Sequence, residues 1–396
     1  MRKTIITALV LLNVLINAYS QNSVPFFHHY HRKSLENVFS KFETEKKGRV
    51  AFLGGSITYN PGWRDSVCQI LMVKFPETKF DFINAGVPSM GSIPDAFRFE
   101  KDVLKNGKVD LLFVEAAVND EVNKSDTTEI LRAMEGIARH AKISNPECGV
   151  VFMYFVDPAK MASYRNGRIP DIIELHEKVA AHYNISSINL ALEVTERIDA
   201  GEFDWENDFK DLHPSPFGQN IYYQSIRKFL EDELTLKGKN ANDTILPEPL
   251  DKSNYSKGVL VAPVPPRKIK GWDWVENWKP EDGKATRADY TDVPMLVGEY
   301  PGEIIKFQFR GNAVGIAVAA GPDAGIIEYS IDESDWEKLD LFTEWSAGLH
   351  LPWFYTLGAG LKNRKHMLQI RMTSGKNPKS IGNKCVIRYF YVNDEE

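Results

Sequence analysis

The chain has little cysteine, no excess of positive charge and only one long apolar run. Its three cysteines (Cys68, Cys148 and Cys385) are widely spaced and odd in number, so they form no metal-binding pattern and allow at most one disulfide. We expect three buried thiols. The net charge is −6 and no basic stripe stands out, which argues against nucleic-acid binding. The sequence also lacks internal repeats and low-complexity tracts.

The one long apolar run lies at the N-terminus. Arg2 and Lys3 precede the run from Ile5 to Ile16, and Ala18-Tyr19-Ser20 has the small-x-small form of a cleavage site. Because the run is short and wrongly flanked for a stable membrane span, residues 1–20 are predicted to be a cleaved signal peptide; an uncleaved anchor is the alternative. We therefore expect a secreted or periplasmic protein whose mature form has no membrane span.

At 396 residues, 43% of them hydrophobic and 26% charged, the chain is long enough for two folded domains. Up to about Thr235, short apolar runs alternate with stretches of helix length. This alternation predicts an α/β domain with a parallel sheet covered on both faces. The expected strands are Val50–Leu53, Phe80–Asn84, Leu111–Ala116, Val150–Val156 and Ile185–Asn189. The expected helices are near Trp63–Phe75, Pro94–Lys105, Thr127–Ser144, Pro170–His182 and Pro216–Leu230.

The texture of the sequence changes after residue 235. Residues 236–258 are polar and interrupted by proline, which predicts a linker. Residues 259–396 carry short alternating runs with turn residues, typical of an antiparallel β-sandwich of jelly-roll type, with Gly311-Asn312 and Ile331-Asp332 as hairpin corners. We therefore predict a signal peptide at 1–20, an α/β domain at 21–235, a linker at 236–258 and a β-domain at 259–396.

Four short motifs occur in one order along the first domain, and three of them follow predicted strands. They are Gly54-Gly55-Ser56-Ile57-Thr58, Asn84-Ala85-Gly86, Val118-Asn119-Asp120 and Asp211-Leu212-His213-Pro214. In parallel sheets, ligands bind beyond the carboxyl ends of the strands. Together the motifs supply a nucleophile, a backbone donor, a carboxamide donor and a base, the groups that acyl transfer requires.

Each motif also has a simpler interpretation. Ser56 can be a turn or helix-capping serine, Gly86 a glycine needed for a turn, and Asn119-Asp120 a helix cap. In the functional interpretation, the Gly-Gly turn brings backbone N–H groups close to Ser56, and Gly86 N–H and the Asn119 carboxamide face an oxyanion held over it. The phosphate-loop patterns and the GxSxG nucleophile elbow are absent.

His213 is the candidate base. A neutral imidazole near Ser56 can take its proton if a carboxylate fixes its tautomer, and Asp211 is the natural partner. Residues two apart in an extended segment point to the same side, although direct contact between these two requires a turn.

Other clusters are weaker candidates. His28, His29 and His31 resemble a metal cluster but have no obvious remote ligand in the sequence, so no metal or cofactor is expected. The aromatic-rich stretch with Trp345, His350, Trp353, Phe354 and Tyr355 can stack on sugars, but core packing explains such residues more often.

The four motifs in order resemble the SGNH (GDSL) hydrolase superfamily, with Ser56, Gly86, Asn119 and His213 at its four named positions over roughly residues 49–232. The resemblance implies a flavodoxin-like three-layer parallel sheet and ester hydrolysis through an acyl-serine without a metal. The Gly-Gly-Ser-Ile-Thr variant followed by a β-domain is similar to secreted bacterial enzymes that remove acetyl groups from polysaccharides.

Two positions depart from the family pattern. Gly55 stands where the family commonly has Asp, and Lys210 stands where it usually has the acid three residues before its histidine. The triad acid is then Asp211 or Asp208, or else a backbone carbonyl orients His213 in a Ser–His dyad. Arg64 can contact the substrate from the first helix.

The sequence thus predicts a serine esterase that acts on an acetylated carbohydrate. One alternative is a lipid or thioester hydrolase on the same fold, although no apolar lid is evident. The other is a glycan-binding protein without catalytic activity, for which Lys210 is the best support.

Overall fold

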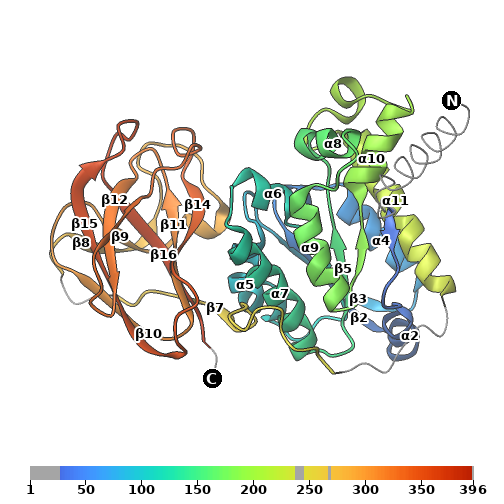
Figure 1. Cartoon of the computed structure of the whole chain (residues 1–396), viewed down its shortest axis with the longest axis horizontal. Helices are drawn as coiled ribbons and strands as arrows, with labels where there is room; N and C mark the ends of the chain where they lie inside the picture. The colour runs from blue at the N-terminus through green and yellow to red at the C-terminus, as the bar shows by residue number, and fades with distance from the viewer. Residues whose placement is uncertain (1–26, 237–244, 266–268, 395–396) are drawn as a thin grey trace, which may run out of the picture.

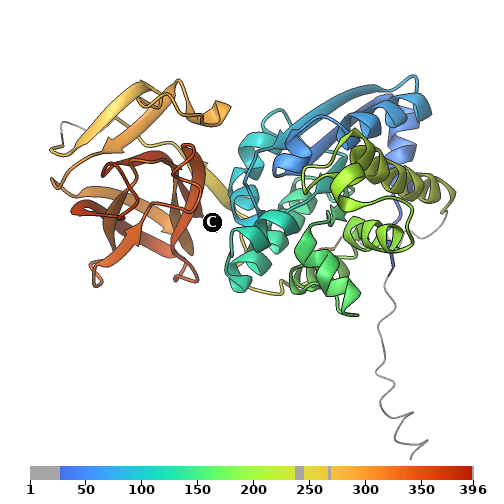
Figure 2. The same ribbon diagram turned by 90° about the horizontal axis from the view of Figure 1, so that it is seen from above.

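The computed structural model describes residues 27–236, 245–265 and 269–394. An α/β domain forms the first part and a β-domain the second, and they lie side by side with strand β7 (Gly258–Val261) between them (Figures 1 and 2). The predicted signal peptide lies outside the described residues. Within the described part of the chain, no helix is long and apolar enough to cross a membrane.

The sheet of the first domain has the order β1-β6-β5-β4-β2-β3. Five strands are parallel and follow the flavodoxin-like order, while the short β1 pairs antiparallel with β6 at one edge. The strand order reverses between β2 and β4. The strands are β1 (His29–Tyr30), β2 (Lys47–Gly54), β3 (Lys79–Gly86), β4 (Leu111–Val114), β5 (Gly149–Met153) and β6 (Ser186–Ile188). All five predicted strands are therefore confirmed, whereas β1 was not predicted.

Helices cover both faces of this sheet. α5, α7 and α9 pack in a row on one face, and α4 and α11 pack together on the other, with α2 against α11 (Figure 1). The main helices are α2 (Glu36–Glu45), α4 (Trp63–Lys74), α5 (Ser92–Phe99), α7 (Thr127–Ser144), α8 (Pro158–Arg165), α9 (Asp171–His182), α10 (Leu190–Asp199) and α11 (Pro216–Thr235). The one-turn α3 (Ser56–Tyr59) and the short α6 (Ala117–Val122) follow β2 and β4. π-Helical turns occupy Glu100–Leu104 and Trp205–Phe209, the first directly continuing α5.

The second domain consists of two antiparallel sheets, as the alternating sequence predicts. One has the order β10-β15-β12-β13, and the other β14-β11-β16-β9-β8 with β7 added on β16. Apolar side chains of both sheets, such as Phe309, Leu368, Val318 and Ile387, form one core between them. The strands are β8 (Trp272–Trp278), β9 (Val293–Gly298), β10 (Ile305–Gly311), β11 (Ala313–Ala320), β12 (Gly325–Ile331), β13 (Glu337–Asp340), β14 (Leu351–Gly358), β15 (Arg364–Lys376) and β16 (Cys385–Asn393).

Of the two predicted hairpin corners, one is correct and one is wrong. Ile331-Asp332 begins the connection between β12 and β13, which pair antiparallel. At Gly311-Asn312, by contrast, the chain crosses from one sheet to the other, because β10 pairs with β15 whereas β11 pairs with β14 and β16. Gly311 has φ +131°, and a Cβ there would lie 2.1 Å from the Asn393 carbonyl oxygen, so this crossing requires glycine.

The segment predicted to be a linker is docked on the first domain. The backbone N–H groups of Leu250 and Asp251 donate to the carboxylate of Glu135 on α7, and Arg132 on α7 pairs with Asp251 at 2.8 Å. Tyr255 N–H donates to the backbone carbonyl of Arg132. The described residues 245–257 therefore connect the domains along a fixed course.

Candidate functional site

The first three motifs meet at the carboxyl edge of the sheet, where the strand order reverses. The parallel register places Gly54 beside Gly86 and Leu53 beside Val114, so the segments that follow β2, β3 and β4 leave the sheet side by side. β2 and β4 are apolar runs buried along most or all of their length, whereas the edge strand β3 is buried only at its last two residues; β2 and β3 both end in glycine, where the chain leaves the sheet. The geometry places the site at the switch point typical of this topology.

Ser56 and His213 meet across this edge. Ser56 Oγ lies 2.7 Å from His213 Nε2, although 157 residues separate them in the sequence. Ser56 begins α3, but the residue that caps this helix is Gly55 and no side chain caps it. The helix-cap interpretation of Ser56 is therefore wrong. The hydroxyl is directed to the imidazole, in the geometry that proton transfer requires.

A turn before α11 presents His213 to the serine. Lys210 adopts φ +88°, a region that disfavours non-glycine residues, and Asp211 Oδ1 accepts a hydrogen bond from the backbone N–H of His213 at 2.5 Å. The same oxygen lies 3.7 Å from His213 Nδ1. Asp208 accepts from Asp204 N–H instead. Between the two candidate acids, the structure brings Asp211 to the imidazole, within a turn.

The two other predicted oxyanion donors also lie at this edge. Gly86 packs so closely on the backbone of α3 that a Cβ would lie 2.4 Å from Tyr59 N. Its N–H donates to Asn84 Oδ1 at 3.0 Å. Asn119 lies within α6, and its carboxamide reaches Gly55, where a Cβ would lie 2.3 Å from Asn119 Oδ1. Asn119 and Asp120 thus lie inside a helix, and the prediction that they cap one is wrong.

Beneath the serine lies a buried carboxyl group that our sequence interpretation missed. Glu115, at the end of β4, accepts hydrogen bonds at one oxygen from Gly55 N–H at 2.7 Å and from the Thr58 hydroxyl at 2.9 Å. Glu115 therefore holds the residue before Ser56 and the helical turn after it in fixed positions. Burial raises the pKa of Glu115 to about 8. A charged residue inside the apolar run Leu111–Ala116 was the available sequence signal.

A buried ion pair holds the preceding turn. Arg98 Nη2 donates to the backbone carbonyl of Gly54 at 3.1 Å, and the guanidinium pairs with Asp95 at 2.7 Å and with Asp102 at 2.9 Å. Burial raises the pKa of Asp95 to about 7, while Arg98 opposes that rise. The three residues lie on α5 and its π-helical continuation, so α5 positions the turn that precedes Ser56.

The buried carboxylate of Asp120 connects three helices near the site. Its carboxylate accepts from Ser92 N–H at 2.7 Å and lies 3.0 Å from His176 Nε2. It therefore joins the start of α5 to α6 and α9. Arg64, named above as a residue that can contact the substrate, donates to the backbone carbonyls of Thr58 at 2.6 Å and Tyr59 at 3.0 Å, at the C-terminal end of α3.

The second domain borders the site. A cavity of about 430 Å³ lies beside Gly86 and Tyr59 and is also lined by residues 286–289 of the β-domain. Charged side chains from both domains line it, among them Arg98, Lys101 and Arg287. Lys101 pairs with Asp289 at 3.0 Å and connects the two walls.

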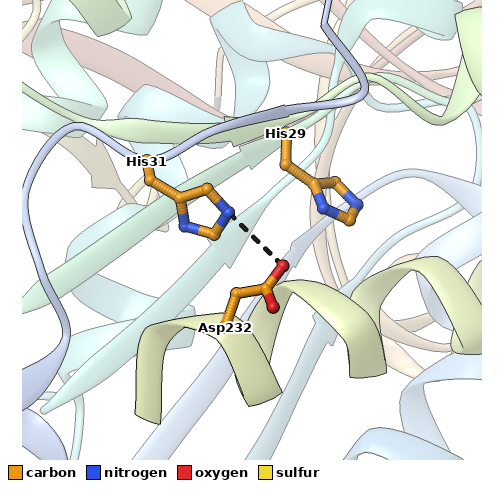
Figure 3. Close-up of side chains that lie close together, drawn as sticks. All are labelled: His29, His31 and Asp232. Carbon is orange, nitrogen blue, oxygen red and sulfur yellow. Dashed lines mark ion pairs between the residues drawn. The ribbon is translucent and has the colours of Figure 1, made fainter. Parts of the chain in front are cut away.

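The three N-terminal histidines lie far from the serine in the fold, where β1 meets α11. Figure 3 shows His29 and His31 facing Asp232, the remote partner that the sequence did not reveal. Burial, together with His31 and His28 nearby, lowers the pKa of His29 to about 4. His28 points elsewhere and pairs with Glu196 at 2.6 Å.

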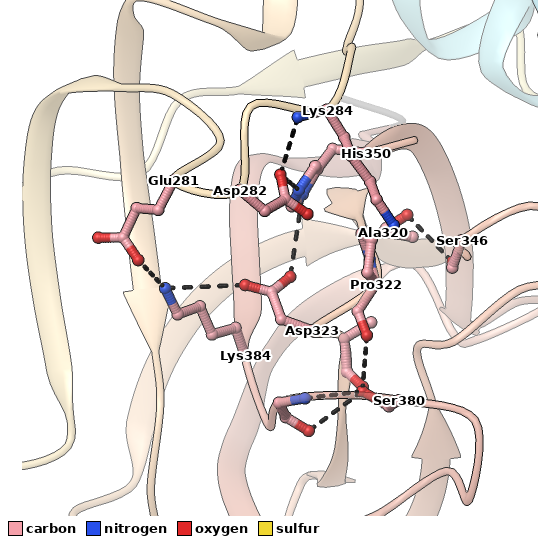
Figure 4. Close-up of polar contacts among 12 residues, drawn as sticks. Glu281, Asp282, Lys284, Ala320, Pro322, Asp323, Ser346, His350, Ser380 and Lys384 are labelled. Carbon is pink, nitrogen blue, oxygen red and sulfur yellow. Dashed lines mark hydrogen bonds and ion pairs between the residues drawn. The ribbon is translucent and has the colours of Figure 1, made fainter. Parts of the chain in front are cut away.

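The aromatic-rich stretch of the β-domain mostly contributes to packing. Trp353 and Tyr355 pack against the core between the sheets, Phe354 stacks on Tyr391 at 5.4 Å between ring centroids, and Trp345 is exposed. His350 is buried, with Nε2 3.1 Å from Asp282 Oδ1, in a polar network that joins several loops (Figure 4).

All three cysteines are free, as expected. Cys148 and Cys385 are buried, whereas Cys68 is only partly buried. Burial raises the pKa of Cys68 and of Cys148 to about 12, so neither thiol is activated as a nucleophile.

Comparison with known proteins gives a family-model match and similar folds. Residues 52–221 match the model of the GDSL-like lipase/acylhydrolase family. A two-domain esterase active on acetylated mannans, co-crystallized with mannopentaose, is similar over 92% of this chain and 96% of its own, with 21% identity and a TM-score of 0.73. Another structure of a two-domain esterase with this activity is similar over 92% and 97%, with 20% identity and the same TM-score of 0.73.

An acetylxylan esterase from Geobacillus stearothermophilus covers 46% of this chain with 94% of its own, at 16% identity and a TM-score of 0.38. No curated protein sequence matches the chain. The likeness to the two-domain esterases extends over both domains. Residues 52–221 therefore match the GDSL-like lipase/acylhydrolase family, and the chain folds as an SGNH hydrolase domain followed by an antiparallel β-domain.

Proposed function

We propose that this protein is a secreted serine esterase that removes acetyl groups from a polysaccharide or oligosaccharide. The observation that carries the proposal is the 2.7 Å contact between Ser56 Oγ and His213 Nε2 at the carboxyl edge of the sheet. The predicted signal sequence supports secretion. The structural likeness to a two-domain esterase active on acetylated mannans supports the choice of an acetylated carbohydrate.

The chemistry follows from the positions of these groups. His213 Nε2 takes the proton of Ser56 as Oγ attacks the acetyl carbonyl, and then gives it to the departing sugar hydroxyl. Water repeats the sequence on the acyl-serine. The N–H groups of Ser56 and Gly86 and the carboxamide of Asn119 stabilise the oxyanion, each contributing about 3–4 kcal/mol to lowering the barrier. For Gly86 N–H to take part, Asn84 Oδ1 must turn away from it.

The charged lining of the cavity beside Gly86 supports a polar substrate over a long acyl chain, which requires an extended apolar groove. A series of model esters with increasing acyl length tests this preference. We expect the rate to be highest for acetyl and to fall with length. A maximum at long chains would instead favour the lipid-hydrolase alternative.

The central test is the Ser56→Ala variant. We expect hydrolysis of a small acetyl ester to fall about 10³-fold or more, because the nucleophile is lost. Circular dichroism should remain unchanged, since Ser56 is partly exposed and caps no helix. Equal activity of the two proteins would contradict the serine-esterase mechanism. Mass spectrometry of acetate release from a panel of acetylated glycans then identifies the sugar.

A further inference from the structure

Two histidines and an aspartate face one another where β1 meets α11, on the first domain. The ligand atoms of His29, His31 and Asp232 all lie within 4.8 Å of one another (Figure 3). Both imidazoles are held by Phe229 of α11: the His31 ring stacks on it at 4.8 Å between centroids, and the His29 ring meets it edge-on at 5.8 Å. Contact with Phe229 therefore orients both histidine rings before any ligand arrives.

The hydrogen bonds of His31 set its tautomer. Its Nδ1 lies 2.5 Å from Glu233 Oε1, and the other oxygen of this buried carboxylate accepts from Leu35 N–H at 2.8 Å. Because the carboxylate accepts at both oxygens, the proton of His31 is on Nδ1. Nε2 then keeps its lone pair, and it lies 3.9 Å from Asp232 Oδ2.

His29 is set in the opposite tautomer. Its Nε2 lies 3.0 Å from Ser225 Oγ, and Ser225 donates its hydroxyl proton to Glu193. The hydroxyl has one proton, so it accepts from His29 Nε2–H. The lone pair of His29 is left on Nδ1, the nitrogen that Figure 3 shows turned toward Asp232.

We propose that His29 Nδ1, His31 Nε2 and Asp232 bind a zinc ion, with water completing its coordination. Two imidazole nitrogens and a carboxylate suit Zn²⁺, and carboxylates or hydroxyls behind the imidazoles are the usual partners that orient zinc ligands. Tetrahedral zinc with bonds of about 2 Å holds its ligand atoms about 3.3 Å apart, so the site must close by up to about 1.5 Å. The side chain of Asp232, which is 36% exposed, can move its oxygen toward both imidazoles, and small rotations of the two histidine rings can shorten the distance between their nitrogens.

Lys228 competes with the ion. Its Nζ donates to both oxygens of Asp232, at 2.5 and 2.6 Å, one helical turn away on the surface of α11. Zinc must displace this ammonium group. Once bound, the ion links the N-terminal strand to the last helix of the first domain, and so opposes separation of an edge strand of only two residues.

Titration calorimetry with zinc chloride on the full chain, without a polyhistidine tag, tests the proposal. We expect one ion per chain, and a melting temperature that rises by about 3–5 °C at a hundredfold excess over Kd and falls again with a chelator. His31→Asn keeps the Nδ1-like donor to Glu233, and His29→Gln keeps the Nε2-like donor to Ser225. Each variant removes only the ligand nitrogen, and each should weaken binding at least tenfold, as should Asp232→Asn.

Matched variants separate this site from other histidines. Lys228→Ala should tighten binding, because it frees Asp232, whereas His182→Asn and His213→Asn should leave this binding event unchanged. The proposal is overturned if neither the natural chain nor Lys228→Ala binds zinc at about 100 μM, an affinity of roughly −5.5 kcal/mol. It is equally overturned if His31→Asn and Asp232→Asn bind as tightly as the natural chain. Neither result depends on esterase activity.

Discussion

At the scale of single residues, the acid beside His213 differs from a buried triad aspartate in its exposure and in its hydrogen bond. Asp211 is exposed, and its main hydrogen bond is to the backbone N–H of His213 rather than to the ring. An exposed ion pair contributes about 0–1 kcal/mol, far less than a buried triad aspartate. Asp211 therefore shapes the turn that places the imidazole, and we expect this to be its main contribution.

This role predicts unequal effects of two substitutions. Asp211→Asn keeps the oxygen that accepts from His213 N–H, so kcat/KM for a small acetyl ester should fall by no more than about fivefold. Asp211→Ala also removes the oxygen that accepts from His213 N–H and so disrupts the turn. We expect kcat/KM to fall further in this variant than in Asp211→Asn. Asp208→Asn is the matched control, because Asp208 bonds to Asp204 N–H. A loss near 10⁴-fold in Asp211→Asn would instead identify a full triad acid.

Glu115 gives a prediction about pH. Its pKa is raised to about 8, so between its ordinary value and pH 8 the folded protein keeps a proton that the unfolded chain releases. The free energy of unfolding therefore falls as pH rises through this window, by at most about 1.4 kcal/mol per pH unit. Glu115→Gln keeps the acceptor for Gly55 and Thr58 but does not titrate. The melting temperature of Glu115→Gln minus that of the natural chain should therefore increase from pH 5 to pH 8.

Calorimetric scans of both proteins at each pH measure this difference. Comparison at matched pH is necessary because Asp95 also has a raised pKa, which both proteins share. Parallel pH dependence in the two proteins would show that Glu115 is ionised in the fold. Glu115→Ala, which loses both contacts at the Ser56 turn, should reduce esterase activity where Glu115→Gln does not.

At the scale of elements, the turn after β2 depends on a residue without a side chain. Gly55 has φ −89°, which any residue can adopt, so its requirement is one of space: a Cβ would meet Asn119 Oδ1 at 2.3 Å and the Met90 carbonyl oxygen at 3.1 Å. Gly55 stands where aspartate is common in the GDSL pattern, and in this chain the Asn119 carboxamide on α6 occupies the space that a side chain there would need.

We expect Gly55→Ala to displace the Asn119 carboxamide and lower kcat about 10²-fold, the usual cost of losing one oxyanion donor. The fold should persist, because the strain is local to one contact. Gly348→Ala is the control, since its nearest neighbour lies 3.7 Å from the added carbon. If Gly55→Ala retains full activity, the Asn119 carboxamide is not held where the structure places it.

The elements also show what sequence alone can and cannot predict. Apolar runs predicted all the parallel strands, and the α7 bounds agree at Thr127–Ser144. The crossing at Gly311 was mistaken for a hairpin, because a turn between two strands has the same residues whichever partners the strands take. The contacts of Glu115 and the turn at Lys210 depend on tertiary packing, which no local pattern records.

At the scale of the whole molecule, the two domains share packed apolar surface. The first domain's core includes Tyr255 of the connecting segment and Tyr391 of β16. Phe97 of α5 contacts both rings, at 4.8 and 4.4 Å between centroids, and a Cβ at Gly136 of α7 would meet the Tyr255 backbone at 2.6 Å. Because buried aromatic packing joins the domains, they should unfold together rather than as independent units.

Substitution of Tyr391 by alanine tests this coupling. The ring is fully buried, so Tyr391→Ala should lower the free energy of unfolding by about 3–5 kcal/mol, the range for large aromatic truncations. The variant should also show two calorimetric transitions instead of one, because the β-domain no longer packs against Phe97 of α5 through the Tyr391 ring. Tyr300→Ala, at an exposed ring, should leave the single transition unchanged. Two transitions already present in the natural chain would show that the domains fold independently, and the β-domain would then border the cavity at Gly86 without stabilising the domain that forms it.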